Sequence, residues 1–151
     1  MYYTMQDLYE LALRFRQAIE SAIACREVSD LNMLNYPRGC CAYASTLLQR
    51  YLFENGVMTF YMSGEYGDGL EIFESHAWLE TECGIVIDIT GDQYTNNPNI
   101  RFSNSVYIGS RENGFHNKFR LHAPIPYSEW GEYGIGMKNK ILYEAIIRHI
   151  N

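Results

Sequence analysis

The sequence predicts an α+β fold in which N-terminal helices pack on an antiparallel β-sheet and a further helix follows at the C-terminal end. Helical periodicity dominates the chain up to residue 54, short β-type runs follow from residue 57, and helical periodicity returns near the end. The length of 151 residues is typical of one domain. No repeat, low-complexity tract or linker divides the chain, so we expect residues 1–151 to form a single domain.

Two helices are predicted in the N-terminal third. Apolar residues recur at helical spacing over Met5–Arg26, after an N-cap candidate at Thr4. The segment Ser29–Gly39 combines Asn, Pro and Gly without a sustained period and is predicted to be a loop. Helical spacing then returns over Cys40–Glu54, where Gly56 supplies a C-terminal stop. The pair of adjacent cysteines therefore falls in the first turn of the second predicted helix.

The middle of the chain is predicted to form consecutive antiparallel strands. The Gly-rich stretch Gly64–Gly69 supplies one of the turns between them. The predicted strands are Val57–Met62, Phe73–Glu80, Ile85–Thr90 and Ser105–Ile108. A last amphipathic helix is predicted over Lys138–Ile150.

Composition and charge exclude several classes of protein. A hydrophobic content of 47% with 20% charged residues is that of a globular chain, not of a disordered, collagen-like or coiled-coil one. The net charge of -6 argues against a nucleic-acid partner, which would require an extended cationic surface. No apolar run approaches the ~20 residues of a membrane span, and the start lacks the basic and apolar regions of a Sec signal. We therefore expect no membrane partner and a cytoplasmic protein, while delivery as an effector would leave no such signal.

The four cysteines favour thiol chemistry over disulfide bonding. Cys40 and Cys41 are adjacent, and pairing them with Cys25 and Cys83 would close few loops, so a reduced protein is favoured. A thiol is a strong nucleophile only as thiolate, which the unpaired N–H groups and dipole at a helix N-terminus favour. The position of Cys40 and Cys41 is therefore typical of a nucleophile.

A base and an orienting group for this thiol are found on two of the predicted strands. Strand alternation puts His76 and Trp78 on one face. Asp88 lies in an apolar run, where a carboxylate needs a partner. The separation of 88 - 76 = 12 residues is enough for two short strands and a turn, so we expect the two side chains to meet across an antiparallel pair.

These motifs resemble those of the transglutaminase-like superfamily, which shares the papain-like cysteine-peptidase fold. The resemblance covers about residues 37–90, and aligning the family's Gly-x-Cys motif places the nucleophile at Cys41. The spacing between His76 and Asp88 is short for the family. Four motifs occur in the family's order, namely Gly39-Cys40-Cys41, the leucine-rich helix from Leu47-Leu48 to Gly56-Val57, His76-Ala77-Trp78 and Asp88-Ile89-Thr90.

The resemblance implies a papain-like core with a Cys–His–Asp site for acyl transfer. Cys41 would be the nucleophile, His76 the base and then the acid, and Asp88 the group that orients the imidazole. Such a site attacks an amide or ester carbonyl of a peptide, a protein side chain or a small amide and forms a thioester. The family includes peptidases, amidases, deamidases and crosslinking transferases, and the chemistry implies no cofactor. The alternative is a catalytically inactive protein-binding module with the same fold, and nothing in the sequence selects a substrate or an oligomeric state.

An oxyanion donor is needed besides the backbone N–H of Cys41, and Gln93, Trp78 and Asn35 are the candidates. Metal binding is disfavoured and no metal is expected, because the adjacent cysteines lack the C-x2-4-C spacing of zinc sites. His116 and His122 fit no triad spacing and are expected to be loop or packing residues.

Overall fold

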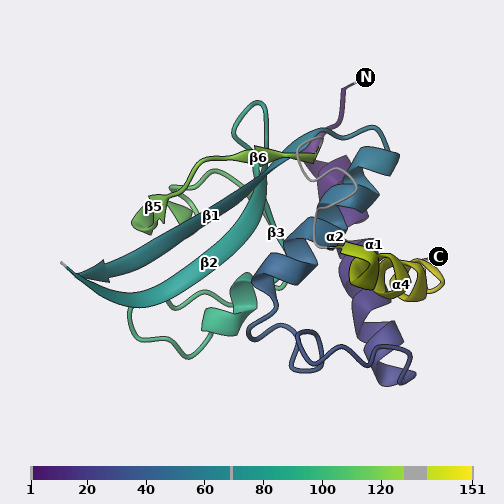
Figure 1. Cartoon of the computed structure of the whole chain (residues 1–151). Helices are drawn as coiled ribbons and strands as arrows, with labels where there is room; N and C mark the ends of the chain where they lie inside the picture. Colours follow the sequence, from purple (N-terminus) through teal and green to yellow (C-terminus); the bar gives the residue numbers. More distant parts are fainter. Residues whose placement is uncertain (1, 69, 128–135, 151) are drawn as a thin grey trace.

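The computed structural model describes residues 2–68, 70–127 and 136–150, of which 136–139 are described by their backbone alone. This part of the chain has the predicted α+β class, with helices at both ends of the sequence and an antiparallel sheet between them (Figure 1). In chain order the elements are α1 (Met5–Ala24), α2 (Cys41–Glu54), β1 (Thr59–Asp68), β2 (Glu71–Thr81), β3 (Val86–Asp88), η1 (Gly91–Tyr94), β4 (Tyr107–Gly109), η2 (His116–Lys118), β5 (Arg120–Leu121), β6 (Ile125–Pro126) and α4 (Gly136–Ile147).

Residues typical of helix ends mark the start of α1 and the end of α2. Thr4 and Asp7 form a reciprocal capping box at the start of α1, with N–O distances of 2.9 and 3.0 Å. Helix α2 ends at the predicted stop, where Gly56 has a φ of +82°. The prediction for α1 was two residues too long because Arg26 turns into the left-handed region. Among the described residues no helix has the length and apolar character needed to cross a bilayer.

The sheet is built around a long hairpin. Its order is β4-β3-β2-β1-β5, with β6 also paired to β1, and all of the described pairs are antiparallel. Figure 1 shows the far end of the β1–β2 hairpin reaching away from the helices. The predicted strands Val57–Met62 and Phe73–Glu80 were too short, since pairing continues to Asp68 and Glu71.

Two glycines of the predicted turn Gly64–Gly69, Gly64 and Gly67, lie within strand β1 instead. A Cβ atom at Gly67 would lie 1.8 Å from the carbonyl oxygen of Glu71, at the irregularity in the β1–β2 register. Gly67 therefore permits close approach of two strands within the hairpin. The predicted turn Gly64–Gly69 was wrong over residues 64–68, while Gly69 lies outside the described residues.

The later elements differ from their predicted bounds by a few residues. The predicted strands Ile85–Thr90 and Ser105–Ile108 correspond to β3 and β4, and the predicted helix Lys138–Ile150 corresponds to α4. Strands β5 and β6 were not predicted, because two-residue strands carry no readable periodicity.

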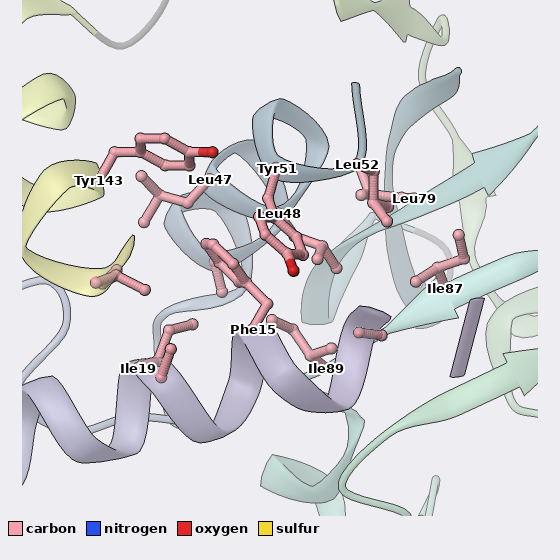
Figure 2. Close-up of a cluster of buried hydrophobic side chains, with 14 of the residues drawn as sticks. Phe15, Ile19, Leu47, Leu48, Tyr51, Leu52, Leu79, Ile87, Ile89 and Tyr143 are labelled. Atoms are coloured by element: carbon pink, nitrogen blue, oxygen red, sulfur yellow. The ribbon is translucent and has the colours of Figure 1, made fainter. Parts of the chain in front are cut away.

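Two apolar clusters cover the two faces of the sheet. On one face α1, α2 and α4 pack together, and Figure 2 shows Phe15, Leu48 and Tyr51 facing Leu79 and Ile87 of the sheet. On the other face, side chains of the segment between β3 and β5 pack against Trp78. The second cluster is rich in aromatic residues and consists of Met62, Trp78, Val86, Tyr94, Ile100, Tyr107, Phe115 and Phe119.

Candidate active site

The structure brings His76 and Asp88 together as the sequence predicted. His76 lies in β2 and Asp88 ends β3, and both are at most 2% exposed. The pairing of Leu79 with Ile87 sets these strands in register, and alternation then directs both side chains to the same face of the sheet. His76 Nε2 lies 2.7 Å from Asp88 Oδ2, which is a short charge-assisted hydrogen bond.

Asp88 accepts hydrogen bonds on both of its oxygens. Its Oδ1 accepts from the backbone N–H of Thr90 at 2.9 Å and from the Thr90 hydroxyl at 3.4 Å. Its Oδ2 accepts from His76 and also from His116 Nε2, again at 2.7 Å. Burial alone would raise the pKa of Asp88, but the two imidazoles outweigh it and lower this pKa well below its usual range. Asp88 is therefore a fixed anion.

The electrostatic environment of His76 favours the imidazolium form. Burial alone would lower the pKa of His76, but the carboxylate of Asp88 and a hydrogen-bonding interaction with Cys41 raise it to about 9. Because Nε2 is bonded to Asp88, the ring presents Nδ1 on its opposite side. His76 therefore links the sheet carboxylate to the thiol at the start of α2.

The two adjacent cysteines have different environments. Cys41 is the first residue of α2 and is partly exposed. Cys40 is the buried N-cap, and its thiol donates to the carbonyl oxygen of Arg38 over 3.1 Å. Burial, together with the neighbouring Cys41, raises the pKa of Cys40 to about 11. Access to solvent and an electrostatic interaction with His76 thus distinguish Cys41 as the candidate nucleophile.

The three candidate oxyanion donors are placed differently. The side-chain nitrogen of Gln93, in η1, lies 3.2 Å from His76 Nδ1, the ring nitrogen that is not bonded to Asp88. The indole N–H of Trp78 donates to the buried carboxylate of Glu80 at 2.8 Å. Asn35 is exposed in the loop before α2. Only Gln93 among the three combines an available amide with a direct contact to the His76 ring.

A buried arginine connects α1 to this part of the site. Both terminal nitrogens of Arg16 donate to the carboxylate of Asp92, at 2.7 and 2.8 Å. Its NH1 also donates to the carbonyl oxygens of Ile89 and Ser105, both at 2.8 Å. Since Asp92 precedes Gln93 in η1, Arg16 fixes the turn that carries Gln93 to His76.

His116 is the site residue that sequence reasoning missed. It was expected to be a loop or packing residue, but it is fully buried and donates to Asp88 from the start of η2. Its Nδ1 has no hydrogen-bond partner among the described residues. The ring stacks between Phe115 and Tyr107, with centroids 4.2 and 5.5 Å away. Phe115, directly before His116, was the one adjacent apolar signal for burial, since polar Asn117 follows. The partner of His116 could not be read from a segment without periodicity.

His76, Asp88 and His116 together also carry ligand atoms of the kind that bind metals. Ligand atoms around a tetrahedral zinc ion lie about 3.3 Å apart, given bonds of about 2.0–2.1 Å. The observed 2.7 Å separations are instead those of direct hydrogen bonds, and all three side chains are buried, unlike exposed groups that can move apart around an ion. His122 is exposed and lies 3.3 Å from Glu65, outside this cluster.

Neither a protein-family model, nor a curated protein, nor a solved structure matches this chain. The assignment of a chemical role to Cys41, His76 and Asp88 thus depends on their geometry and on the motifs that carry the transglutaminase-like resemblance.

Proposed function

We propose that this protein is a thiol-dependent hydrolase or acyltransferase that acts on an amide or ester carbonyl through Cys41, His76 and Asp88. The observation that carries the proposal is the hydrogen bond between buried His76 and the carboxylate of Asp88, in an imidazole whose pKa the Cys41 thiol also raises. A thiol at a helix N-terminus, an imidazole and an orienting carboxylate are the three parts that covalent acyl transfer requires. The resemblance to transglutaminase-like enzymes names the same three residues.

The proposed first step is attack of the Cys41 thiolate on the carbonyl carbon. A carbon–sulfur bond forms, and the electron pair of the carbonyl bond moves to oxygen. The backbone N–H of Cys41, which lies in the first turn of α2 without an intrahelical acceptor, is placed to stabilise that oxyanion. The Gln93 amide, beside the His76 ring, is the second proposed donor.

The remaining steps move one proton through His76. Collapse of the tetrahedral intermediate expels the amine or alcohol, which takes its proton from the His76 imidazolium and leaves a thioester on Cys41. Water or an amine then attacks the thioester while His76 accepts its proton, and the carbon–sulfur bond breaks to restore the thiolate. Asp88, held as an anion by its donors, keeps Nε2 protonated and Nδ1 directed toward the reacting groups.

The first test of this proposal is the pH dependence of iodoacetamide labelling at each cysteine, resolved by peptide mass spectrometry. We expect Cys41 to label rapidly at pH 6, where an ordinary thiol with a pKa of about 8.5 is almost unreactive. The exposed residues Cys25 and Cys83 are internal controls in the same sample. In His76→Gln the fast labelling of Cys41 should fall to the rate of these controls.

A second measurement separates a reactive thiol from an enzyme. Incubation with an activated ester such as p-nitrophenyl acetate should add one acetyl group to Cys41 and release p-nitrophenol in a burst. Cys41→Ala should show neither, while its circular dichroism stays unchanged. If Cys41 labels with the rate and pH dependence of Cys25 and Cys83, the proposal is wrong and the inactive binding module is favoured.

A further inference from the structure

Away from the candidate active site, the ends of α1 and α4 bring together three side chains of a kind that binds metals. Cys25 caps the C-terminus of α1, Glu27 follows two residues later, and His149 lies just beyond α4. One ligand atom from each lies within 4.8 Å of the others. His149 Nε2 is 2.9 Å from Glu27 Oε2, and its side chain is 19% exposed. Cys25 and His149 are 149 - 25 = 124 positions apart, so no sequence motif joins them.

The backbone after α1 is arranged so that Cys25 and Glu27 reach the same point. The N–H of Glu27 donates to the carbonyl oxygen of Ala22 and that of Arg26 to Ile23, both at 3.0 Å. This is the Schellman pattern, which needs a left-handed residue, and Arg26 fills that position with a φ of +58°. The chain reverses there and brings Glu27 beside the cap residue.

The electrostatic setting favours a cation. The carbonyl ends of helices carry partial negative charge, and neither α1 nor α4 has a basic residue in its last turn. Arg148 is the competing cation, with its guanidinium 3.9 Å from Glu27 Oε2. That distance is long for an ion pair and Arg148 is 65% exposed, so the side chain can leave without exposing buried surface.

We propose that Cys25, Glu27 and His149 form a binding site for a divalent cation of the zinc class, with water as a fourth ligand. Thiolate and imidazole donors select zinc over calcium or magnesium, and three protein ligands with one open position are typical of zinc. On binding, the Cys25 thiol releases its proton to solvent as the metal–sulfur bond forms. Around a tetrahedral ion with bonds of about 2.0–2.3 Å, ligand atoms lie roughly 3.3–3.7 Å apart. His149 Nε2 and Glu27 Oε2, which are 2.9 Å apart, therefore separate by less than about 1 Å on binding, and Cys25 Sγ, within 4.8 Å of both, approaches by at most about 1 Å. The ion would then tie the end of α1 to the C-terminal end of the chain.

Cobalt titration tests the site without any measurement of activity. The titration uses the full chain carrying Cys41→Ala, so that the candidate nucleophile contributes no thiolate. We expect Co²⁺ to give the near-ultraviolet absorption of a cobalt–thiolate bond, and Zn²⁺ to displace it. Cys25→Ser should remove this band, whereas Cys83→Ser, which changes the other exposed cysteine, should keep it.

Affinity measurements by calorimetry complete the test. Loss of His149 as a ligand in His149→Gln is expected to weaken zinc binding by about 100-fold or more, since loss of even an outer-shell partner costs about 10–100-fold. Arg148→Gln should strengthen binding, because the competing cation is removed. Zinc should raise the thermal unfolding temperature of the parent chain and not that of Cys25→Ser. A cobalt spectrum without a thiolate band, or equal zinc affinity in the parent and Cys25→Ser chains, overturns the site.

Discussion

At the scale of single residues, Asp88 controls the chemistry that the candidate site can perform. Four hydrogen bonds reach its two oxygens, and two of them come from imidazoles that share Oδ2. A buried carboxylate without such donors would become protonated and could not orient an imidazole. His116 therefore supports the candidate site through Asp88, although it does not face the thiol.

The contribution of His116 can be measured with two substitutions. His116→Gln keeps a nitrogen donor at the position of Nε2, whereas His116→Phe keeps the ring volume and removes the donor. We expect His116→Phe to lose about 1–3 kcal/mol of stability, because Asp88 loses a hydrogen bond in a buried site. Labelling of Cys41 by iodoacetamide at pH 6 should slow in His116→Phe and recover in His116→Gln. Equal labelling rates in the two variants would show that His116 acts only in packing.

The two adjacent cysteines should respond oppositely to substitution. Cys41→Ala is expected to abolish acyl transfer with little change in unfolding free energy, because this side chain is partly exposed. Cys40→Ala is expected to keep the rapid labelling of Cys41 and to lose about 1–2 kcal/mol, since a buried sulfur and its hydrogen bond to Arg38 are removed. Urea unfolding and burst kinetics measure the two effects. Acyl transfer that survives in Cys41→Ala would exclude this residue as the nucleophile.

The residues of the site were predictable to different degrees for physical reasons. Asp88 was predicted to need a partner because apolar neighbours in a strand leave a carboxylate no solvent. His116 and Arg16 were not recognised, because the partner of each is fixed by tertiary structure: His116 is 28 residues from Asp88, and Arg16 is 76 residues from Asp92. Hydrophobic periodicity indicates which face of an element is buried, but it does not identify an arginine that lies on that face.

At the scale of elements, the short helix η1 depends on α1 for its position. Arg16 makes hydrogen bonds to Asp92 and to two backbone carbonyls on either side of η1, and is itself 7% exposed. Helices α1 and η1 are therefore joined by the bidentate ion pair between Arg16 and Asp92.

Removal of the Arg16 guanidinium should destabilise the protein and disturb the site. Arg16→Met is expected to cost about 3–5 kcal/mol, because Asp92 and two carbonyl groups lose their partner. Arg16→Lys keeps the charge but cannot form the bidentate pair, and should recover only part of the loss. Glu20→Gln, at the exposed end of the same network, is the control and should change stability little. Urea unfolding measures these differences. A free energy of unfolding for Arg16→Met equal to that of the wild-type chain would contradict the assigned role.

Element boundaries were least predictable in the β1–β2 hairpin. Glycines normally indicate turns, but at Gly67 the missing side chain permits the approach of Glu71 across the hairpin. Helix ends were predicted closely where a capping residue is present, as at Thr4 and Gly56. The sequence therefore specifies the order and type of the long elements better than the extent of their pairing.

At the scale of the whole molecule, the raised pKa of His76 makes folding stability depend on pH. The ordinary pKa of 6.5 applies to the unfolded chain and about 9 to the folded one, so the folded state holds this proton more tightly. The stabilisation is complete below about pH 6.5 and is lost as pH rises through about 9. Asp88 has the opposite sign: its stabilisation is present above the ordinary pKa of 3.8 and is lost at more acidic pH.

Urea unfolding between pH 5 and pH 10 checks this dependence. The free energy of unfolding of the wild-type chain should fall between about pH 6.5 and pH 9, as the linkage of His76 requires. In His76→Gln the slope over this window should be smaller, whatever the overall stability of that variant. The same slope in both chains would show that His76 is not the responsible group.

The order of the site residues along the chain has a consequence for protein synthesis. Cys41 precedes His76 by 76 - 41 = 35 residues and Asp88 by 88 - 41 = 47 residues, and His116 comes later still. A growing chain thus carries the thiol before its imidazole exists, and the carboxylate before its second donor. Since a domain folds as a unit, a ribosome-bound fragment that ends before Asp88 holds an ordinary cysteine. Under the proposed mechanism, the Cys41 thiol therefore becomes reactive only when the sheet is complete.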